Sequence, residues 1–447
     1  MKLSTGLCAF LLSQVFLVVT STTPSIEKHR IIPVNDPNDI LITFGSCNAV
    51  MGDEQNDIFN RIVDLKPDTY IWLGDVTYID VNEMPPKFKF PGEDKAKQKF
   101  EETKNNSNYQ NLRGATHIIG VWDDHDFGHN NAGKSFLYKN ITKQLWLDFI
   151  DEPQNTTRRT RQGGIYQSYY LGDVTKVKVI LLDVRWDREE PFFLDFGGGE
   201  LLGEDQWQWL EEELKDNPAE YTIIGSGIQI LADDRIFTER WFTSSKERLL
   251  RLIRKYQTGG LILLSGDVHY TEMMKYPCKE RIGFELHEFC SSGITHYASS
   301  HVPNVDGVVS ELYPYTYNNK EDRYYERNFG KVRLTFGEKR SAKIEAINYY
   351  GATVLEREIP YEDLIFDESI IDDSSSCVVD TFNHLRFVKH FIHSLAVGRP
   401  YIWLITFGIV WSITLIITIL RVLIRVFSWL LKRIISQRQA NQKIKSD

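Results

Sequence analysis

The chain has 447 residues, of which 42% are hydrophobic and 25% charged; these proportions fit a globular protein and exclude a fibrous or largely disordered one. Its formal charge is −9 at pH 7, to which residues 1–21 contribute +1 and residues 421–447 contribute +6, so the residues between them carry −16. A body this acidic is not expected to bind nucleic acid through a basic face.

Both ends of the chain have the composition of targeting segments. The apolar run from Leu7 to Val19 follows Lys2 and precedes small polar residues, which predicts a secretory signal peptide over residues 1–22. Residues 400–420 contain no charged side chain and would span roughly 30 Å as a helix, the thickness of a bilayer core. Basic residues follow this segment, so the pattern predicts a single-pass type I membrane protein with a basic cytosolic tail at residues 421–447.

We expect the rest of the chain to lie outside the cell or in the lumen of the secretory or endolysosomal pathway. It divides into one domain at residues 23–365 and an acidic linker to the membrane at residues 366–399. Three N-glycosylation sequons fall on the same side and agree with this orientation, at Asn105, Asn140 and Asn155.

The spacing of the cysteines suggests one disulfide. Cys8 lies within the signal peptide, whereas Cys278 and Cys290 are twelve residues apart and would be candidates for pairing in an oxidising compartment. Cys47 and Cys377 are left over.

The domain alternates strand-like and helix-like segments. Apolar residues recur at helical spacing over residues 57–65 and 204–214, and apolar runs of strand length lie between such segments. This alternation predicts a layered α/β fold, with an antiparallel continuation after Gly330 and a charged surface insertion at residues 81–112. In chain order, the predicted strands are residues 40–44, 69–73, 118–122, 177–182, 221–225, 261–264, 332–336 and 342–348.

Polar residues able to bind ligands follow most of these strands. In layered α/β folds, ligands gather at the carboxyl ends of the strands, so we expect these clusters to meet at one edge of the molecule. The clusters are GSC at 45–47, GD at 74–75, DDHD at 123–126, DVR at 183–185 and GDVH at 266–269.

The carboxylates and imidazoles of the clusters favour a metal site. Asp75 alone could cap a turn and residues 123–126 could form a solvated turn, but three carboxylates around a histidine repel one another unless cations are present. Asp267 and His269 are two residues apart, so in an extended chain their side chains face the same way. The simplest arrangement is a two-metal site with one bridging carboxylate, which would hold a phosphate and activate a water.

Three further residues could take part in such a site. Arg185 could form paired hydrogen bonds with a phosphate or only a surface salt bridge. Cys47 lies where a first ligand would be expected; a free cysteine is more often simply buried, but a thiolate beside the phenolate of Tyr78 would favour iron over magnesium or zinc.

These segments together resemble the PhoD-like (alkaline phosphatase D type) branch of the calcineurin-like metallophosphoesterases. The resemblance covers about residues 40–350, with the matching segments in the expected order. They are FGSCN at 44–48, GDVTYID at 74–80, VWDDHDFGHNNAG at 121–133, GIYQSYYLG at 164–172, LLDVRWDR at 181–188, LLGEDQWQWLEEEL at 201–214, IGSGIQIL at 224–231, LSGDVHYTEM at 264–273 and EFCSSGITH at 288–296.

The resemblance implies a four-layer α/β/β/α sandwich with a binuclear metal site between its sheets. It implies hydrolysis of phosphate esters by a metal-bound hydroxide, without a covalent phosphoenzyme. The expected metals are Fe³⁺ with Ca²⁺, and Zn²⁺, Mn²⁺ or Mg²⁺ stay open. Two departures from the family pattern are Asn131, where an aspartate is common, and the short segment before the first motif.

Matched by motif, individual residues acquire expected roles. Asp75 would bridge the metals and His125 would contact the phosphate and assist the leaving group. Arg185 is expected to bind substrate and support catalysis, and His296 could line the pocket or be an ordinary loop histidine. The expected metal ligands are Cys47, Asp75, Tyr78, Asp124, Asp267 and His269, with Asp124 at the position of an asparagine ligand in related phosphoesterases.

The main hypothesis is therefore a membrane-anchored, metal-dependent ectoenzyme that hydrolyses small phosphate esters. Two alternatives stay open: a phosphodiesterase acting on lipid head groups or nucleotides, and a non-catalytic receptor or binding ectodomain that keeps metals for structure. The intact set of ligand residues and His125 argue against the second. The oligomeric state is left open.

Overall fold

The computed structural model of the chain describes residues 30–49, 57–81, 88–190, 199–232, 239–300, 305–306, 309, 316–372, 377 and 407–427 except 422 and 425. The predicted signal peptide and residues 428–447 of the predicted tail lie outside the described residues. The three sequon asparagines, Asn105, Asn140 and Asn155, are exposed, and their glycosylation stays a prediction.

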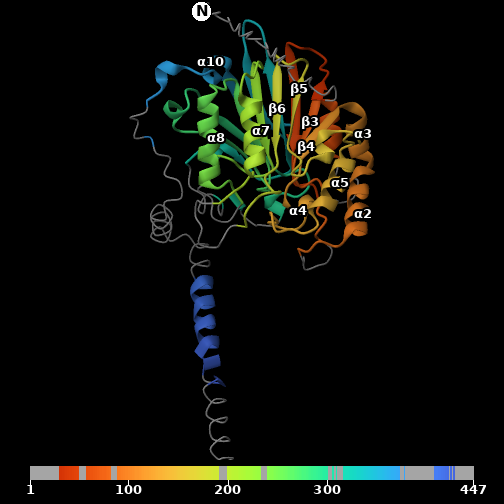
Figure 1. Cartoon of the computed structure of the whole chain (residues 1–447), viewed down its shortest axis with the longest axis vertical. Coiled ribbons are helices and arrows are strands. Elements are labelled where there is room, and N and C mark those ends of the chain that lie inside the picture. The colour runs from red at the N-terminus through yellow and green to blue at the C-terminus, as the bar shows by residue number, and fades with distance from the viewer. Residues whose placement is uncertain are drawn as a thin grey trace, which may run out of the picture.

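Two β-sheets form the centre of the domain (Figure 1), which confirms the expected mixed α/β class. The eight-stranded sheet runs, in spatial order, β1 (Ile31–Ile32), β5 (Gln167–Leu171), β6 (Val177–Leu182), β7 (Tyr221–Ser226), β8 (Leu261–Ser265), β10 (His287–Ser291), β9 (Thr271–Lys275) and β11 (Arg323–Tyr324). The six-stranded sheet runs β14 (Thr353–Pro360), β13 (Ser341–Asn348), β12 (Asn328–Thr335), β2 (Asp39–Gly45), β3 (Thr69–Leu73) and β4 (His117–Val121).

The strand directions place the site at one end of both sheets. β2, β3 and β4 are mutually parallel, as are β6, β7, β8 and β10, so their carboxyl ends lie together within each sheet. β12 pairs antiparallel with β2 and β13, as expected for the region after Gly330.

The sheets pack face to face because their strands are apolar on both sides. Ile262 and Leu264 of β8 join the core shared with the six-stranded sheet, whereas Leu261 and Leu263 point to the opposite face. The rings of Phe44 on β2 and Phe289 on β10 meet edge to face at 5.1 Å between centroids, so these two strands are in contact across the sheets.

Helices cover the outer faces. Trp207 of α7 (Glu204–Leu214) and Leu249 of α8 (Thr243–Lys255) pack with Leu261 and Leu263 on the eight-stranded sheet. On the other sheet, Trp72 contacts the rings of α1 (Ile58–Asp64) and α3 (Ser107–Ala115). The remaining helices are α2 (Glu93–Lys104), α4 (Asp124–Phe127), α5 (Lys139–Phe149), α6 (Thr157–Thr160), α10 (Tyr361–Leu364) and the 3₁₀ turns η3 (Lys279–Arg281), η4 (Ala298–Ser300), η5 (Lys320–Asp322) and η6 (Glu368–Ile370).

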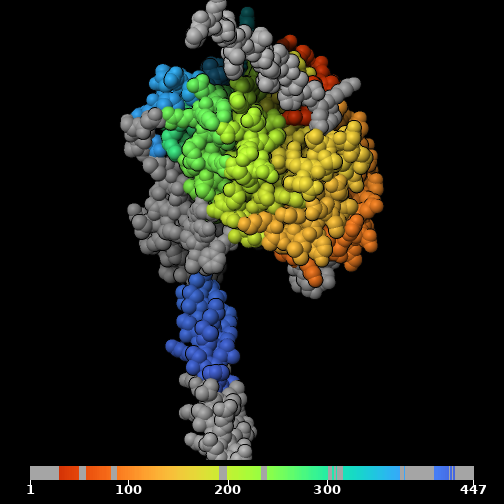
Figure 2. Space-filling view, viewed as in Figure 1, coloured from red at the N-terminus to blue at the C-terminus, as the bar shows by residue number. Residues whose placement is uncertain are grey.

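The predicted surface insertion at residues 81–112 belongs largely to this helical layer. It contains α2 and most of α3, and Phe100, Tyr109 and Leu112 are buried. Charged residues on the solvent side of these helices hid the apolar spacing. In Figure 2, the surface over α7 and α8 (green) meets the surface of the first half of the chain (orange and yellow) as one body.

The predicted disulfide between Cys278 and Cys290 is wrong. Cys278 pairs with Cys377, 99 residues away, and Cys290 is a buried free thiol. Cys290 lies opposite Glu272 inside the β9–β10 pair, whereas Cys278 lies beyond the end of β9, too far along the hairpin for the Cα separation that a disulfide needs. The start of the predicted linker is attached to the domain by the same region, since Asp367 and Asp372 donate backbone hydrogen bonds to the carbonyls of Gly283 and Glu280.

The prediction of a single-pass membrane protein with an extracellular or luminal domain is also corrected. In the part of the chain that the structure describes, no helix has both the length and the apolarity needed to cross a membrane.

Candidate metal centre

The ends of β2, β3, β4 and β8 bring the predicted ligand residues together between the sheets. Three groups of side chains each offer ligand atoms that lie within 4.8 Å of one another. Asp75 belongs to two of these groups and Asp124 to two, so the three form one continuous cluster. The groups are Cys47, Asp75 and His269; Asp75, Asp124 and His125; and Asp123, Asp124 and Asp267.

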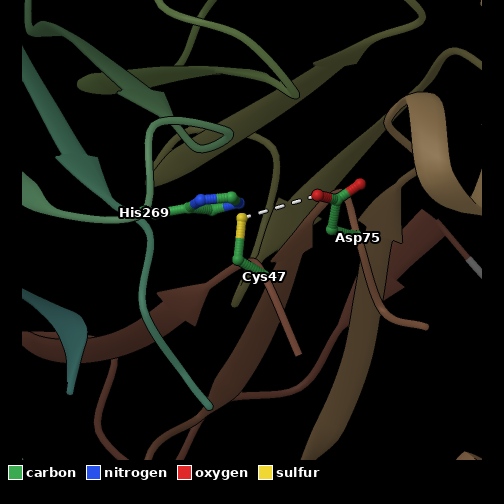
Figure 3. Close-up of side chains that lie close together, drawn as sticks. All are labelled: Cys47, Asp75 and His269. Atoms are coloured by element: carbon green, nitrogen blue, oxygen red, sulfur yellow. Dashed lines mark hydrogen bonds between the residues drawn. The ribbon is translucent and has the colours of Figure 1, made fainter. Parts of the chain in front are cut away.

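Cys47 directs its sulfur into this cluster. Its thiol donates to Asp75 Oδ2 at 3.5 Å, and His269 lies beside it (Figure 3). Sγ is also 3.0 Å from Ser292 Oγ. Burial and the nearby carboxylates of Asp75 and Asp267 raise the pKa of the Cys47 thiol, so a thiolate here requires a cation to balance its charge.

Two carboxylates of the cluster, Asp75 and Asp267, form no ion pair with any residue that the structure describes. Burial and neighbouring carboxylates raise the pKa of Asp75 and of Asp267 well above the usual range. Asp75 Oδ1 and Asp123 Oδ2 are buried and accept no hydrogen bond from any described residue. Orphaned carboxylate oxygens beside a thiol and two imidazoles are what a metal would coordinate, so the residues fit a metal site.

Asp124 differs from its neighbours because polar groups already surround it. Although burial acts in the opposite direction, the charges of His125 and Arg185 and two backbone N–H groups lower the pKa of Asp124 to about 2. The N–H groups are those of His125 and Asn131, at 2.9 and 2.6 Å. Asp124 is therefore held as a carboxylate at neutral pH.

Tyr78, His269 and His296 form an aromatic wall on the Cys47 side. The Tyr78 hydroxyl lies 3.2 Å from His269 Nε2. The ring of His296 stacks on that of His269 at 4.0 Å, and the backbone N–H of His296 donates to the carbonyl of Cys47. The structure thus brings His296 to the cluster, while its contact with substrate stays a prediction.

His125 is oriented by a residue to which the sequence patterns assigned no role. Its Nδ1 lies 2.8 Å from Oδ1 of Asp80, which is fully buried, and Asp80 Oδ2 accepts from the Asn130 N–H. Lys99 holds the same loop by donating to the carbonyls of Tyr78 and Val81. Asp80 is the last residue of the GDVTYID motif. Its position five residues after Asp75 was the sequence signal that could have identified it as a residue of the site.

Arg185 occupies a different environment from the one expected. It is fully buried, so it forms no surface salt bridge. Its Nε donates to Asp123 Oδ1 at 2.5 Å, and its guanidinium also pairs with Glu239, which in turn pairs with Arg188. Its described contacts hold Asp123 against the cluster, and its contact with a phosphate stays a prediction.

Two aspartates of the polar clusters support loops and lie outside the three ligand groups. Asp126 accepts from the Asp123 N–H at 2.7 Å and from Trp146 Nε1 at 3.0 Å. Asp183 accepts from the N–H groups of Ile165, Arg185 and Trp186. Of the aspartates at 123–126, Asp123 and Asp124 are the ones that belong to the ligand groups.

Comparison with known proteins agrees with this geometry. The sequence profile described as PhoD-like phosphatase matches residues 42–343, which is more than half of the chain and includes every residue of the cluster. The chain belongs to the PhoD-like phosphatase family. Curated proteins gave no sequence match.

A solved structure shares the fold of this PhoD-like phosphatase at low sequence identity. The structure of PhoD is 16% identical, with a TM-score of 0.53 over 70% of this chain and 66% of that chain. The match thus spans about two thirds of that protein's length, and at this identity it shows a common fold alone. GAP50, the anchor in the inner membrane complex of Plasmodium, is 10% identical with a TM-score of 0.42 over 79% of this chain and 94% of that chain.

Proposed function

We propose that this PhoD-like phosphatase hydrolyses small phosphate esters, monoesters and also diesters, at the cluster joined by Asp75 and Asp124. The supporting observation is that three sets of metal-ligand atoms overlap in a buried space where two carboxylate oxygens have no described partner. Bound cations would supply positive charge to the phosphate oxygens and lower the pKa of a water that attacks phosphorus.

The donor atoms divide the cluster into two sides. We assign Cys47, Tyr78 and His269 to the side that suits Fe³⁺, because a thiolate, a phenolate and an imidazole together favour iron over magnesium or zinc. Asp123, Asp124 and Asp267 offer only oxygen, which suits a hard cation such as Ca²⁺. Asp75 lies between the two sides and is the proposed bridge.

His125 is the proposed proton donor to the leaving group. Because Nδ1 faces Asp80, Nε2 is the ring nitrogen that can serve the reaction. As water oxygen bonds to phosphorus, the ester P–O bond breaks, and the leaving oxygen takes the proton from His125. The products are phosphate, or a phosphate monoester from a diester, and an alcohol.

The decisive variant is Asp75→Asn in the full chain. We expect turnover of p-nitrophenyl phosphate and of its bis-ester to fall by at least about 1,000-fold, with a loss of bound metal by elemental analysis. Chelation of the unaltered protein should have the same effect, and added metal should restore activity.

Asp68→Asn is the matched control, because Asp68 is a buried aspartate just before β3, at the other end of the strand that leads to Asp75. It accepts hydrogen bonds from the N–H groups of Asn35 and Leu41 and should change stability only. Full activity and full metal content in Asp75→Asn would refute the proposed site.

A further inference from the structure

Phe88 stands beside the proposed proton donor. The centroid of its ring lies 5.8 Å from that of His125, with 49° between the ring planes. Phe88 is bridged to Val81, and the N–H of Lys89 donates to the carbonyl of Asp80, so the chain here is attached to the loop that orients His125. The Phe88 side chain is nevertheless 50% exposed.

Phe90, two residues further along the chain, belongs to a second pair of aromatic rings. Phe90 is stacked on Tyr138 at 5.0 Å between centroids, and Tyr138 is 49% exposed. We call Phe88, Phe90 and Tyr138 the aromatic rim. Six large hydrophobic residues are exposed among the described residues from 30 to 372. Three of them belong to this rim or adjoin it in sequence: Phe88, Leu137 and Tyr138. The other three are Ile31, Tyr350 and Ile365.

Exposed aromatic rings are unfavourable in water unless another group covers them. The position of Phe88 beside His125 indicates which group that is. His125 gives its proton to the leaving oxygen, so the group attached to that oxygen lies on the His125 side of the phosphate. Two described aromatic residues have rings that contact the ring of His125: Tyr78, which is buried, and Phe88, which is half exposed. A flat apolar group could stack there, whereas none of the three rim side chains offers a charge to a polar leaving group.

We propose that the aromatic rim binds the alcohol portion of the substrate, and that this protein prefers phosphate esters whose alcohol carries an aromatic ring. The proposal rests on the proposed function, since it places the leaving group by the position of His125. Phe88 would determine specificity and take no part in proton transfer.

Benzyl phosphate and methyl phosphate test this preference, because their leaving alcohols have closely similar acidity and differ in the ring. We expect the metal-loaded full chain to hydrolyse benzyl phosphate with a kcat/KM at least about tenfold higher. Phe88→Ala should lower kcat/KM for benzyl phosphate about tenfold and leave that for methyl phosphate within about twofold. Phe88→Tyr, which keeps the ring, should retain the preference.

Tyr350→Ala is the matched control, because Tyr350 is an exposed aromatic residue in the turn between β13 and β14, packed against Tyr349. It should leave both rates unchanged. An equal loss for both esters in Phe88→Ala would assign Phe88 to the support of His125 and overturn the proposal, as would no loss for either.

A binding measurement separates this proposal from the proposed catalysis. Benzylphosphonate, which cannot be hydrolysed at its P–C bond, should bind about tenfold more tightly than methylphosphonate by calorimetry, and Phe88→Ala should remove the difference. If neither ester is hydrolysed but this difference persists, the subsite stands and the catalytic proposal fails. Equal affinities of the unaltered protein for the two phosphonates would refute the proposed subsite.

Discussion

Left-handed backbone conformations are concentrated at the metal centre. Among the described non-glycine residues, nine have positive φ, and four of these are proposed ligands: Cys47 (φ 60°), Asp75 (50°), Asp267 (77°) and His269 (62°). Each such residue costs about 1–2 kcal/mol relative to ordinary backbone. The fold tolerates this cost where tight turns after the strands must aim side chains into the space between the sheets.

The two free cysteines differ in the groups that surround their thiols. Both Cys47 and Cys290 are fully buried, and burial raises the pKa of both thiols. Cys47 belongs to a group of ligand atoms with Asp75 and His269, whereas Cys290 Sγ donates to the carbonyl of Gly266. We therefore assign a metal only to Cys47.

Asp80→Asn tests the orientation of His125. An amide in place of the carboxylate weakens the hydrogen bond to Nδ1, so we expect kcat to fall roughly 10- to 100-fold with little change in KM or metal content. Steady-state kinetics and elemental analysis check this. Asp64→Asn, on the exposed side of α1, is the control and should leave kcat unchanged. Unaltered kcat in Asp80→Asn would show that the Asp80–His125 pair is structural only.

At the scale of elements, the approach of the β3 and β4 ends depends on Gly74. Its φ is 89°, and a Cβ built there would lie 2.2 Å from Cβ of Asp123, which no real contact permits. The chain after β3 therefore passes so close to the start of α4 that only glycine fits. This close approach places Asp75 and Asp124 within the same ligand group.

Gly74→Ala should separate these two strand ends. We expect the free energy of unfolding to fall by about 2–3 kcal/mol, because alanine adds both the overlap and an unfavourable φ, and we expect metal content to fall with it. Gly114→Ala in α3 has open space around the new methyl group and should be neutral or stabilise by about 0.5–1 kcal/mol. Denaturant titrations measure both, and equal stability of the two variants would contradict the explanation.

At the scale of the whole molecule, the two sheets are also joined at the end remote from the metal centre. His287, at the start of β10, lies 3.4 Å from Arg357 of β14 and 3.4 Å from Glu285. Burial, reinforced by the charge of Arg357, lowers the pKa of His287 to about 4, although Glu285 acts in the opposite direction. The folded protein therefore holds this imidazole neutral at pH 5–7.

The pH dependence of stability follows from that shift. In the unfolded chain histidine binds its proton near pH 6.5, so between pH 6.5 and 4 the unfolded state binds more protons and stability falls as the pH falls. From pH 7 to pH 5 this contribution is about 2 kcal/mol, and His287→Gln should remove it. Urea unfolding at both pH values measures the difference; exposed His117 on β4 supplies the control, His117→Gln. An unchanged loss in His287→Gln would refute this assignment.

The sequence by itself determined the central strands and pointed to the candidate ligand residues. Residues 261–264 are apolar throughout and residues 71–73 end the run 69–73 with three apolar side chains, as burial on both faces favours, and both runs were found as strands. Asp75, Asp124 and His269 were identifiable because closely placed carboxylates and imidazoles need cations, a property of the side chains themselves.

Only the tertiary structure decided which distant residues meet. Cys278 pairs with Cys377 across 99 residues, and Arg185 reaches Asp123 across 62. Asp80 meets His125 across 45 residues, and Phe88 reaches the same ring from a segment that looked like a surface insertion. Local sequence patterns indicate whether a segment prefers a strand or a helix. These pairs depend instead on how whole elements pack, and the number of residues between two positions does not give their distance in space.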